Sequence, residues 1–255
     1  MTLLVATPVA ASDDAVTLTL GPYQARISQS CDVMTLALAL RHNAFVPQEL
    51  SDQDAFDHLS QHGIVIDTRT NTTCVAFRVR VLHDGIDLNA TYTGRAYGLT
   101  PLHTVKGPFI ELGRVCQSDA QPDPMALRVA WAALTALVDQ HDATMLVGCT
   151  SFPGADVTLH SAALARLRRT HLGPAQLRPT RKSTDAFDLP ASGTKGRLPH
   201  LLEIYLGMGG WVSDHAVIDR TLDTIHIFTG LCIADIPERR KARLRALVHS
   251  AAVSA

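Results

Sequence analysis

Alternating and periodic apolar positions predict a mixture of strands and helices along this chain. Apolar and polar residues alternate over residues 74–81, which is typical of a strand with one buried face. Residues 30–41 and 125–140 repeat apolar positions at helical spacing, and Asp123 and Pro124 supply an N-cap and a first helical residue for the second helix. Further strands are predicted over residues 16–20, 63–67, 109–115, 144–149 and 224–232, and further helices over residues 156–172, 198–207 and 236–248.

Strands and helices follow one another without a strict strand–helix–strand repeat. This order predicts an α/β or α+β protein with a mixed sheet. Residues 85–106 are predicted to be rich in loops, and the tract 173–198 is rich in Pro, Gly, Ser, Thr and basic residues. We therefore predict a core of residues 1–172, a connection of residues 173–198 and a C-terminal extension of residues 199–255 that packs on the core.

The composition is that of a globular protein with a sizeable core. The 255 residues are 46% hydrophobic and 18% charged. The 23 basic and 24 acidic residues give a net charge of −1, which predicts no nucleic-acid partner and no general attraction to an anionic membrane. No apolar run approaches the roughly 18 residues that span a bilayer. We expect a cytoplasmic protein, or one that is peripheral to the inner membrane.

Cysteine and histidine usage favours neither a disulfide framework nor a metal site. The cysteines are odd in number, scattered and free of CxxC spacing, which indicates reduced thiols. The 12 histidines form no metal-binding motif, so we predict no metal. Cys149 is a candidate nucleophile with His160 or His171 as its base. We favour a buried, unreactive thiol, because free cysteines are commonly buried and no third orienting group is evident.

The segment 109–115, Phe-Ile-Glu-Leu-Gly-Arg-Val, carries two opposite charges on a predicted strand. Side chains alternate between the two faces of a strand, so Glu111 and Arg114 point to opposite faces unless a bulge intervenes. Gly113 is a plausible place for such a bulge. A bulge would re-aim one charge and leave backbone N–H groups free to bind a carbonyl oxygen. The alternative interpretation is a surface ion pair on an edge strand.

Several acids and arginines resemble, in order and approximate spacing, the charged residues of acyl-homoserine-lactone synthases. Buried charges are costly unless they are paired with one another, so a shared polar site explains such a set better than isolated buried groups. The matching positions are Arg41 with Phe45, Asp54 with Asp57, Phe77 with Arg78, and Glu111 with Arg114.

A closer resemblance, from about residue 25 to residue 245, is to the ornithine N-acyltransferases that begin ornithine-lipid synthesis. The matching blocks are Phe56-Asp57-His58-Leu59, Glu111-Leu112-Gly113-Arg114-Val115-Cys116, Gly148-Cys149-Thr150-Ser151-Phe152 and residues 199–219, which include Ala216-Val217-Ile218-Asp219. The phosphate-cradling pattern of acetyltransferases is absent, and residues 121–126 stand in its place.

The resemblance implies a GNAT-like α/β fold, with a mixed central sheet flanked by helices and a C-terminal extension. It implies an N-acyltransferase that moves a 3-hydroxyacyl chain from acyl carrier protein to the α-amine of L-ornithine, giving lyso-ornithine lipid. The acyl-phosphopantetheine of the carrier protein would be a co-substrate, and no other cofactor is implied. The alternatives are the same chemistry on another amino acid such as glutamine, acyl-homoserine-lactone synthesis, or a non-catalytic module that binds a carrier protein.

Each candidate residue has an expected role in this chemistry. An attacking amine must lose a proton, and Glu111 can accept it directly or through water, or orient the amine. The predicted catalytic residues are Glu111, Arg114, Arg78 and Asp57. The predicted substrate-binding residues are Arg41, Phe45, Asp54, Val115, Cys116, Ser151 and Phe152.

The densest basic tract is expected to attract an acidic partner. Its members Arg166, Arg168, Arg169, Arg181 and Lys182 are the predicted docking residues for acyl carrier protein, and the alternative is a solvated helix face. The basic helix predicted over residues 236–248 is a candidate for peripheral contact with anionic lipid.

Overall fold

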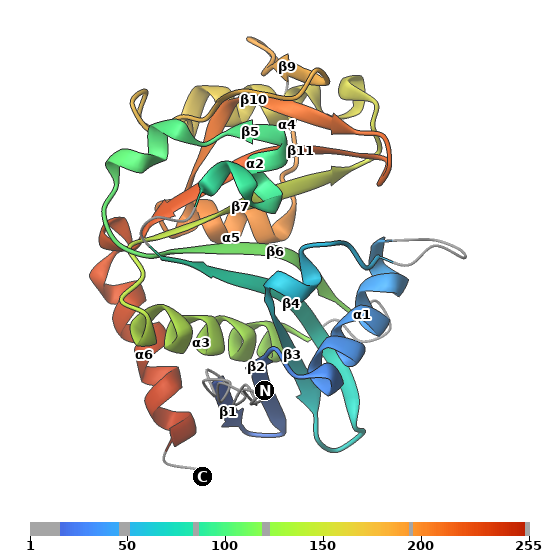
Figure 1. Cartoon of the computed structure of the whole chain (residues 1–255), viewed down its shortest axis with the longest axis vertical. Coiled ribbons are helices and arrows are strands. Elements are labelled where there is room, and N and C mark those ends of the chain that lie inside the picture. The colour runs from blue at the N-terminus through green and yellow to red at the C-terminus, as the bar shows by residue number, and fades with distance from the viewer. Residues whose placement is uncertain (1–15, 46–51, 84–86, 119–122, 194–195, 253–255) are drawn as a thin grey trace, which may run out of the picture.

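A computed structural model describes residues 16–45, 52–83, 87–118, 123–193 and 196–252 (Figure 1). Its main feature is a mixed nine-stranded sheet with the strand order β1-β2-β3-β4-β6-β7-β11-β10-β9. Strands β6 and β7 are parallel, and the other neighbouring strands are antiparallel. The strands are β1 (Val16–Leu20), β2 (Tyr23–Ser28), β3 (Gln61–Asp67), β4 (Thr72–Leu82), β6 (Phe109–Gln117), β7 (Met145–Pro153), β9 (Ala186–Asp188), β10 (Trp211–Asp219) and β11 (Thr224–Cys232).

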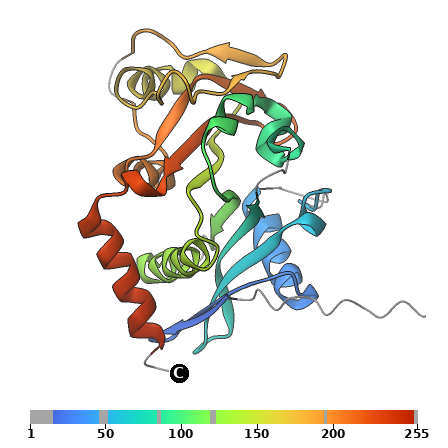
Figure 2. The ribbon, with the colours of Figure 1, turned by 60° about the vertical axis from the view of Figure 1, so that its left-hand side comes forward.

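Helices cover both faces of this sheet. Helix α1 packs on one face of β3 and β4 through Val33 and Ala37, whereas α3 packs on the opposite face, where Phe77 lies. Figure 2 shows α3 and α6 on one side of these strands and α1 on the other. The helices are α1 (Cys31–Phe45), α2 (Tyr92–Ala96), α3 (Pro124–Gln140), α4 (Val157–Thr170), α5 (His200–Gly207) and α6 (Glu238–Ala252). A separate small ladder joins β5 (Tyr97–Gly98) to β8 (Thr180–Arg181).

Most of the predicted elements are present. The strand over residues 224–232 has the predicted bounds, and Asp123 caps α3 as predicted by accepting a hydrogen bond from Met125 N at 2.7 Å. Strands β2 and β10 were not predicted. In β10 a bulge between Val212 and Ala216 interrupts the alternation of apolar and polar residues by which strands are detected.

The predicted division at residues 172 and 198 stays a prediction. Strands β10 and β11, from the predicted C-terminal extension, pair with β7 in the central sheet, and α6 contacts α3. The predicted loop-rich segment contains the short helix α2 and strand β5. None of the helices among the described residues is both long and apolar enough to cross a membrane.

Strands β6 and β7 pair along only part of their length. Their parallel register ends at Leu112–Gly148, although both strands continue for several residues. Gly148 allows the close approach at this last pair, because a Cβ atom there would lie 2.2 Å from the carbonyl oxygen of Leu112. Beyond this point each strand has an edge that the other does not pair. The sheet therefore offers backbone hydrogen-bonding groups next to the segment that carries Arg114.

Candidate active site

A β-bulge places the two charges of strand β6 on the same face of the sheet. Gly113 pairs with Arg78 and Cys116 pairs with Ala76, so two residues of β6 lie opposite one residue of β4. The extra residue follows Gly113, and Arg114 adopts a left-handed backbone conformation with φ of 53°. The predicted bulge is thus confirmed one residue beyond the glycine. Left-handed backbone at a bulky residue is uncommon and is concentrated at functional sites.

The carboxylate of Glu111 is buried and holds the first turn of α2. Its Oε1 accepts a hydrogen bond from Thr93 N at 2.7 Å, and its Oε2 accepts a longer one from Tyr92 N at 3.4 Å. Only 7% of the residue is exposed. Helix N-termini present unpaired N–H groups and favour negative charge, which explains this position. A carboxylate can accept about four hydrogen bonds, so Glu111 retains acceptor capacity for a substrate amine.

Three arginines and three aspartates beside Glu111 form what we call the arginine–aspartate network. Arg41 bonds Asp52 at 2.6 Å and Asp57 at 2.7 Å, and all three side chains are almost completely buried. Buried charges of this kind are tolerated because each has an oppositely charged partner. The network consists of Arg41, Asp52, Asp54, Asp57, Arg78 and Arg114.

The other two arginines join the same acids. Arg78 contacts Asp54 at 2.6 Å and Asp57 at 3.0 Å, while Arg114 contacts Asp52 at 3.1 Å and Asp54 at 3.5 Å. Burial alone would raise the pKa of Asp57, but its hydrogen bonds and the charges of Arg41 and Arg78 outweigh burial and lower that pKa to about 2. Asp57 is therefore ionised at neutral pH, and the network contains as many arginines as aspartates.

Depth within the network separates supporting residues from those that can reach a substrate. The side chains of Arg41 and Asp57 are 0% exposed, so they lie beneath the surface. Neither side chain is accessible, and the roles of Asp57 in catalysis and of Arg41 in substrate binding stay predictions. Asp54 and Arg114 have side chains that are 21% and 12% exposed, and they form the accessible edge of the network.

Aromatic side chains cover this accessible edge. The hydroxyl of Tyr92 accepts a hydrogen bond from Arg114 Nη1 at 2.9 Å, and its ring centroid lies 4.8 Å from Arg114 Cζ and 5.1 Å from Arg78 Cζ. Phe56 packs edge-on against Tyr92, and the ring of Phe45 lies 5.9 Å from Arg114 Cζ. Cation–π contacts hold the guanidinium groups in place. The predicted residue Phe45 is thus brought to the site.

Sequence reasoning missed Asp52 and Tyr92. Asp52 belongs to the acidic segment 51–60, in which Asp54 and Asp57 were singled out, so a third acid at similar spacing was the available signal. Tyr92 lies in the predicted loop-rich segment and reaches the site through the N-terminus of α2. Burial raises the pKa of its hydroxyl, an effect that the charge of Arg114 opposes, so Tyr92 stays protonated at neutral pH.

Two predicted substrate-binding residues have their side chains in the hydrophobic core. Cys116 packs with Ala37 beneath α1, and Phe152 is 2% exposed in the core beneath α4 and α5. These side chains are therefore buried in this structure, and both substrate-binding roles stay predictions. Val115 is half-buried and packs against the core at the bulge, whereas Ser151 is exposed on strand β7.

Cys149 lies on strand β7, on the same sheet face as Glu111. Burial, followed by the charge of Glu111, raises the pKa of the thiol to about 12. A protonated thiol is a poor nucleophile, so the structure favours the unreactive interpretation of this cysteine. In the part of the chain that the structure describes, no group of three or more His, Cys, Asp or Glu residues could hold a metal ion.

The predicted docking tract is partly neutralised by neighbouring acids. Arg166 lies 3.8 Å from Glu203, and Arg181 forms an ion pair with Asp188. The ammonium group of Lys182 donates to the carbonyl oxygen of Gly94 in α2 at 2.5 Å. Arg168 and Arg169 are exposed on the last turn of α4. Carrier-protein docking here stays a prediction.

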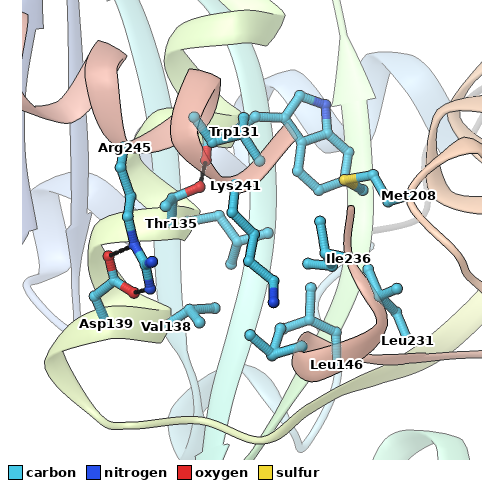
Figure 3. Close-up of a pocket in the computed structure, with 13 residues that line it drawn as sticks. Trp131, Thr135, Val138, Asp139, Leu146, Met208, Leu231, Ile236, Lys241 and Arg245 are labelled. Atoms are coloured by element: carbon cyan, nitrogen blue, oxygen red, sulfur yellow. Dashed lines mark hydrogen bonds and ion pairs between the residues drawn. The ribbon is translucent and has the colours of Figure 1, made fainter. Parts of the chain in front are cut away.

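An apolar pocket between α3 and α6 lies on the sheet face opposite to Glu111 (Figure 3). Trp131 and Val138 of α3 line it, as does Leu146 of β7, whose neighbour Val147 lies on the Glu111 face. The charged groups at its edge are already paired: Arg245 with Asp139 at 2.7 Å, and Lys241 with Glu238 at 2.9 Å. The arginine–aspartate network therefore remains the better candidate for chemistry.

Comparisons with known proteins show which families the chain is similar to. The family model described as an acetyltransferase (GNAT) domain matches residues 38–132. The L-ornithine N(alpha)-acyltransferase of Rhodobacter capsulatus is 28% identical over 228 residues, which cover 80% of this chain and 88% of the relative. The protein of the same name from Brucella abortus is 25% identical over 257 residues, covering 90% of this chain and 92% of the relative.

One solved structure that is similar to this chain is FeeM, an N-acyl amino acid synthase from uncultured soil microbes. It is 10% identical, covers 83% of this chain and 91% of its own, and has a TM-score of 0.45. The predicted GNAT-like α/β fold is confirmed by the matching family model and by the mixed sheet flanked by helices. The predicted resemblance is also confirmed, since the chain is similar over most of its length to curated L-ornithine N(alpha)-acyltransferases.

Proposed function

We propose that this protein is an L-ornithine Nα-acyltransferase, which transfers an acyl chain from a thioester to the α-amine of ornithine. The observation that carries the proposal is similarity over 80–90% of the chain to four curated relatives, all named L-ornithine N(alpha)-acyltransferase. The clustering of the predicted charges around Glu111 supports it, because that cluster supplies what amide formation requires.

The thioester is expected to lie where β6 and β7 separate beyond Leu112 and Gly148. In the reaction, the amine nitrogen forms a bond to the thioester carbon and the bond from that carbon to sulfur breaks. Negative charge develops on the carbonyl oxygen, and backbone N–H groups at the bulge of β6 would stabilise it. Glu111 takes the proton released by the amine, directly or through water, and passes it to the departing sulfur, which leaves as a thiol.

The accessible edge of the network suits the rest of an amino acid. Arg114 is its most accessible arginine and can pair with the α-carboxylate of the acceptor. Asp54, also accessible, can attract the α-amine before the amine loses its proton. Arg41 and Asp57 act from beneath by fixing Asp52, Asp54 and Arg78 in place. These assignments keep charge balanced whether or not the acceptor is bound.

The acyl donor that we propose is acyl carrier protein rather than a free coenzyme A thioester. A phosphate could be bound by N–H groups at the start of a helix such as α3. Here Asp123 accepts the Met125 N–H and a hydrogen bond from the Tyr23 hydroxyl, and Pro124 has no N–H to offer. These two bonds lower the pKa of Asp123, so a carboxylate occupies the position that a phosphate of either donor would need. The choice of carrier protein is supported instead by the exposed Arg168 and Arg169, which would attract an acidic protein.

The experiment that tests this function supplies purified protein with 3-hydroxyacyl carrier protein and a panel of amino acids that includes ornithine and glutamine. Release of free thiol is followed, and the products are identified by mass spectrometry. Ornithine-dependent thiol release with formation of lyso-ornithine lipid is expected, and acyl coenzyme A should be a much poorer donor. Absence of thiol release with every amino acid would refute the proposal. Parallel reactions with S-adenosylmethionine report lactone formation.

A further inference from the structure

The sheet face that carries Glu111 also carries a carboxylate that forms no ion pair with any described side chain. Asp219 is half-buried at the end of β10, where it pairs in register with Thr224 of β11. Its Oδ1 accepts hydrogen bonds from the backbone N–H groups of Thr221 at 3.0 Å and Leu222 at 3.1 Å. No cationic side chain of the described ranges forms an ion pair with it. Asp219 therefore holds a negative charge that the visible structure leaves unbalanced.

A buried histidine stands beside this carboxylate. His226 of β11 lies opposite Val217, so Asp219 is its diagonal neighbour on the same face, with Cα atoms typically about 7–8 Å apart in this arrangement. His226 is 8% exposed. Its Nδ1 lies 3.3 Å from the hydroxyl oxygen of Tyr97, and that hydroxyl also lies 2.9 Å from the carbonyl oxygen of His226.

These two contacts decide which ring nitrogen of His226 carries the hydrogen. The Tyr97 hydroxyl has a single hydrogen, and a carbonyl oxygen can only accept, so this hydrogen goes to the carbonyl of His226. Nδ1 must then be the donor toward Tyr97, which leaves Nε2 with a lone pair. Among the described residues, none bonds to Nε2. Burial lowers the pKa of His226 to about 4, despite the opposing charge of Asp219, so the ring is uncharged at neutral pH.

A short helix joins this pair to the rest of the site. Tyr97 immediately follows α2, and the first turn of α2 holds the carboxylate of Glu111. Five helical residues span about 7.5 Å. The exposed Ser151 lies opposite His226 on the neighbouring strand β7, so the face is accessible between the two ends. The charge of Asp219 also raises the pKa of Tyr92, in agreement with this proximity.

We propose that Asp219 and His226 bind the side-chain ammonium group of the amino-acid acceptor and thereby select a cationic amino acid. Asp219 supplies the opposite charge, and the Nε2 lone pair of His226 accepts a hydrogen bond from the ammonium group. Arg114 and Glu111, one short helix away, hold the reacting end of the same molecule. The inference rests on the proposed function, because it names the part of that site that recognises the acceptor side chain.

The test removes the charge of Asp219 while keeping the hydrogen bonds of the turn that follows β10. Asp219→Asn retains the Oδ1 acceptor for Thr221 and Leu222, and Asp223→Asn removes the same charge from an exposed position of the same turn as a matched control. Wild type should acylate ornithine in preference to norvaline, which lacks the side-chain amine. In Asp219→Asn the KM for ornithine should rise at least about tenfold with little change in kcat, and KM for norvaline should not rise.

A second variant tests the histidine separately. His226→Phe removes the acceptor and should raise the KM for ornithine, whereas His226→Gln keeps a neutral acceptor and should retain more of the affinity. An Asp219→Asn protein that keeps the wild-type ratio of kcat/KM for ornithine over norvaline would overturn the inference.

Direct binding distinguishes this inference from the proposed function. Calorimetric titration of ornithine and norvaline into wild type, Asp219→Asn and Asp223→Asn needs no turnover. Ornithine binding that weakens in Asp219→Asn alone supports the inference, even where no thiol is released and the proposed function fails. Equal binding of ornithine and norvaline by wild type, or binding of neither, would refute it.

Discussion

Strands β6 and β7 separate beyond Leu112 and Gly148, and the charged residues on the two sides of this point differ in whether they form ion pairs. On the β4–β6 side, three arginines and three aspartates satisfy one another, and several of these side chains are fully buried. On the β7–β10 side, Asp219 has no ion pair within the described part of the chain, and His226 has an open lone pair. Ion pairs between buried side chains hold those side chains in a fixed position, whereas a charged group without a partner can bind a ligand. We therefore propose that the first side positions the reacting groups and that the second recognises the acceptor.

Breaking the paired side should have the largest effect. Arg41→Met leaves Asp52 and Asp57 buried without their main partner, and such changes cost about 3–5 kcal/mol of the free energy of unfolding. Urea denaturation measures this loss. Arg26→Met, which breaks the exposed pair with Asp32, is the control and should leave stability nearly unchanged. Equal effects of both substitutions would show that the buried pairs do not support the fold.

Removing the charge of Glu111 should act on catalysis rather than on the fold. Glu111→Gln keeps an oxygen that can accept the Thr93 N–H but cannot take a proton, so kcat should fall by about a hundredfold or more. The assay is thiol release from acyl carrier protein, with a thermal melt as the check on folding. Undiminished kcat in a folded variant would exclude Glu111 as the base.

Disrupting the last pair of β6 and β7 should have a smaller, structural effect. Gly148→Ala places a methyl group 2.2 Å from the carbonyl oxygen of Leu112, which forces β6 and β7 apart and should cost about 1–3 kcal/mol of stability. Gly113→Ala is the matched control, because a Cβ atom there meets no described residue within 4 Å. Comparison of the two unfolding curves tests whether the tight contact at Gly148 matters.

His226 costs no stability at neutral pH but contributes a pH dependence of stability in acid. The pKa of this histidine is about 4 in the fold and about 6.5 when unfolded, so below pH 6.5 the unfolded chain binds the extra proton. Stability from this group is complete above pH 6.5 and falls by at most about 1.4 kcal/mol per pH unit until about pH 4. Urea denaturation of wild type and His226→Phe across this range should show a shallower decline in the variant.

Local sequence patterns predicted most of the fold and the charged part of the candidate site. Alternation and helical spacing predicted most elements, and the charge motif predicted that Glu111, Arg78 and Arg114 act together. The bulge followed from the parity of two charges three residues apart. Strand β10 escaped detection because its own bulge breaks the alternation, and α2 escaped because five residues that include a glycine carry little helical signal.

The unpredicted residues of the site come from contacts between distant segments. Tyr92 meets Arg114 across 22 positions of sequence, and Tyr97 meets His226 across 129. Asp219 belongs to the sequence block 199–219 that resembles ornithine N-acyltransferases, but the sequence assigned it no role. The pairing of β10 with β11 brings it next to His226. Burial also separated residues that look alike in sequence, since Asp54 is accessible and Asp57 is not.

Helix α2 is fastened at both ends and from the side. At its start, Glu111 accepts a hydrogen bond from Thr93 N. Just after its end, the hydroxyl of Tyr97 donates to the carbonyl oxygen of His226, and between them Lys182 donates to the carbonyl oxygen of Gly94. Because α2 has only five residues, a displacement of one end is expected to move the other end as well. A substitution that displaces Tyr97 should therefore also move the N–H groups of α2 that bind Glu111.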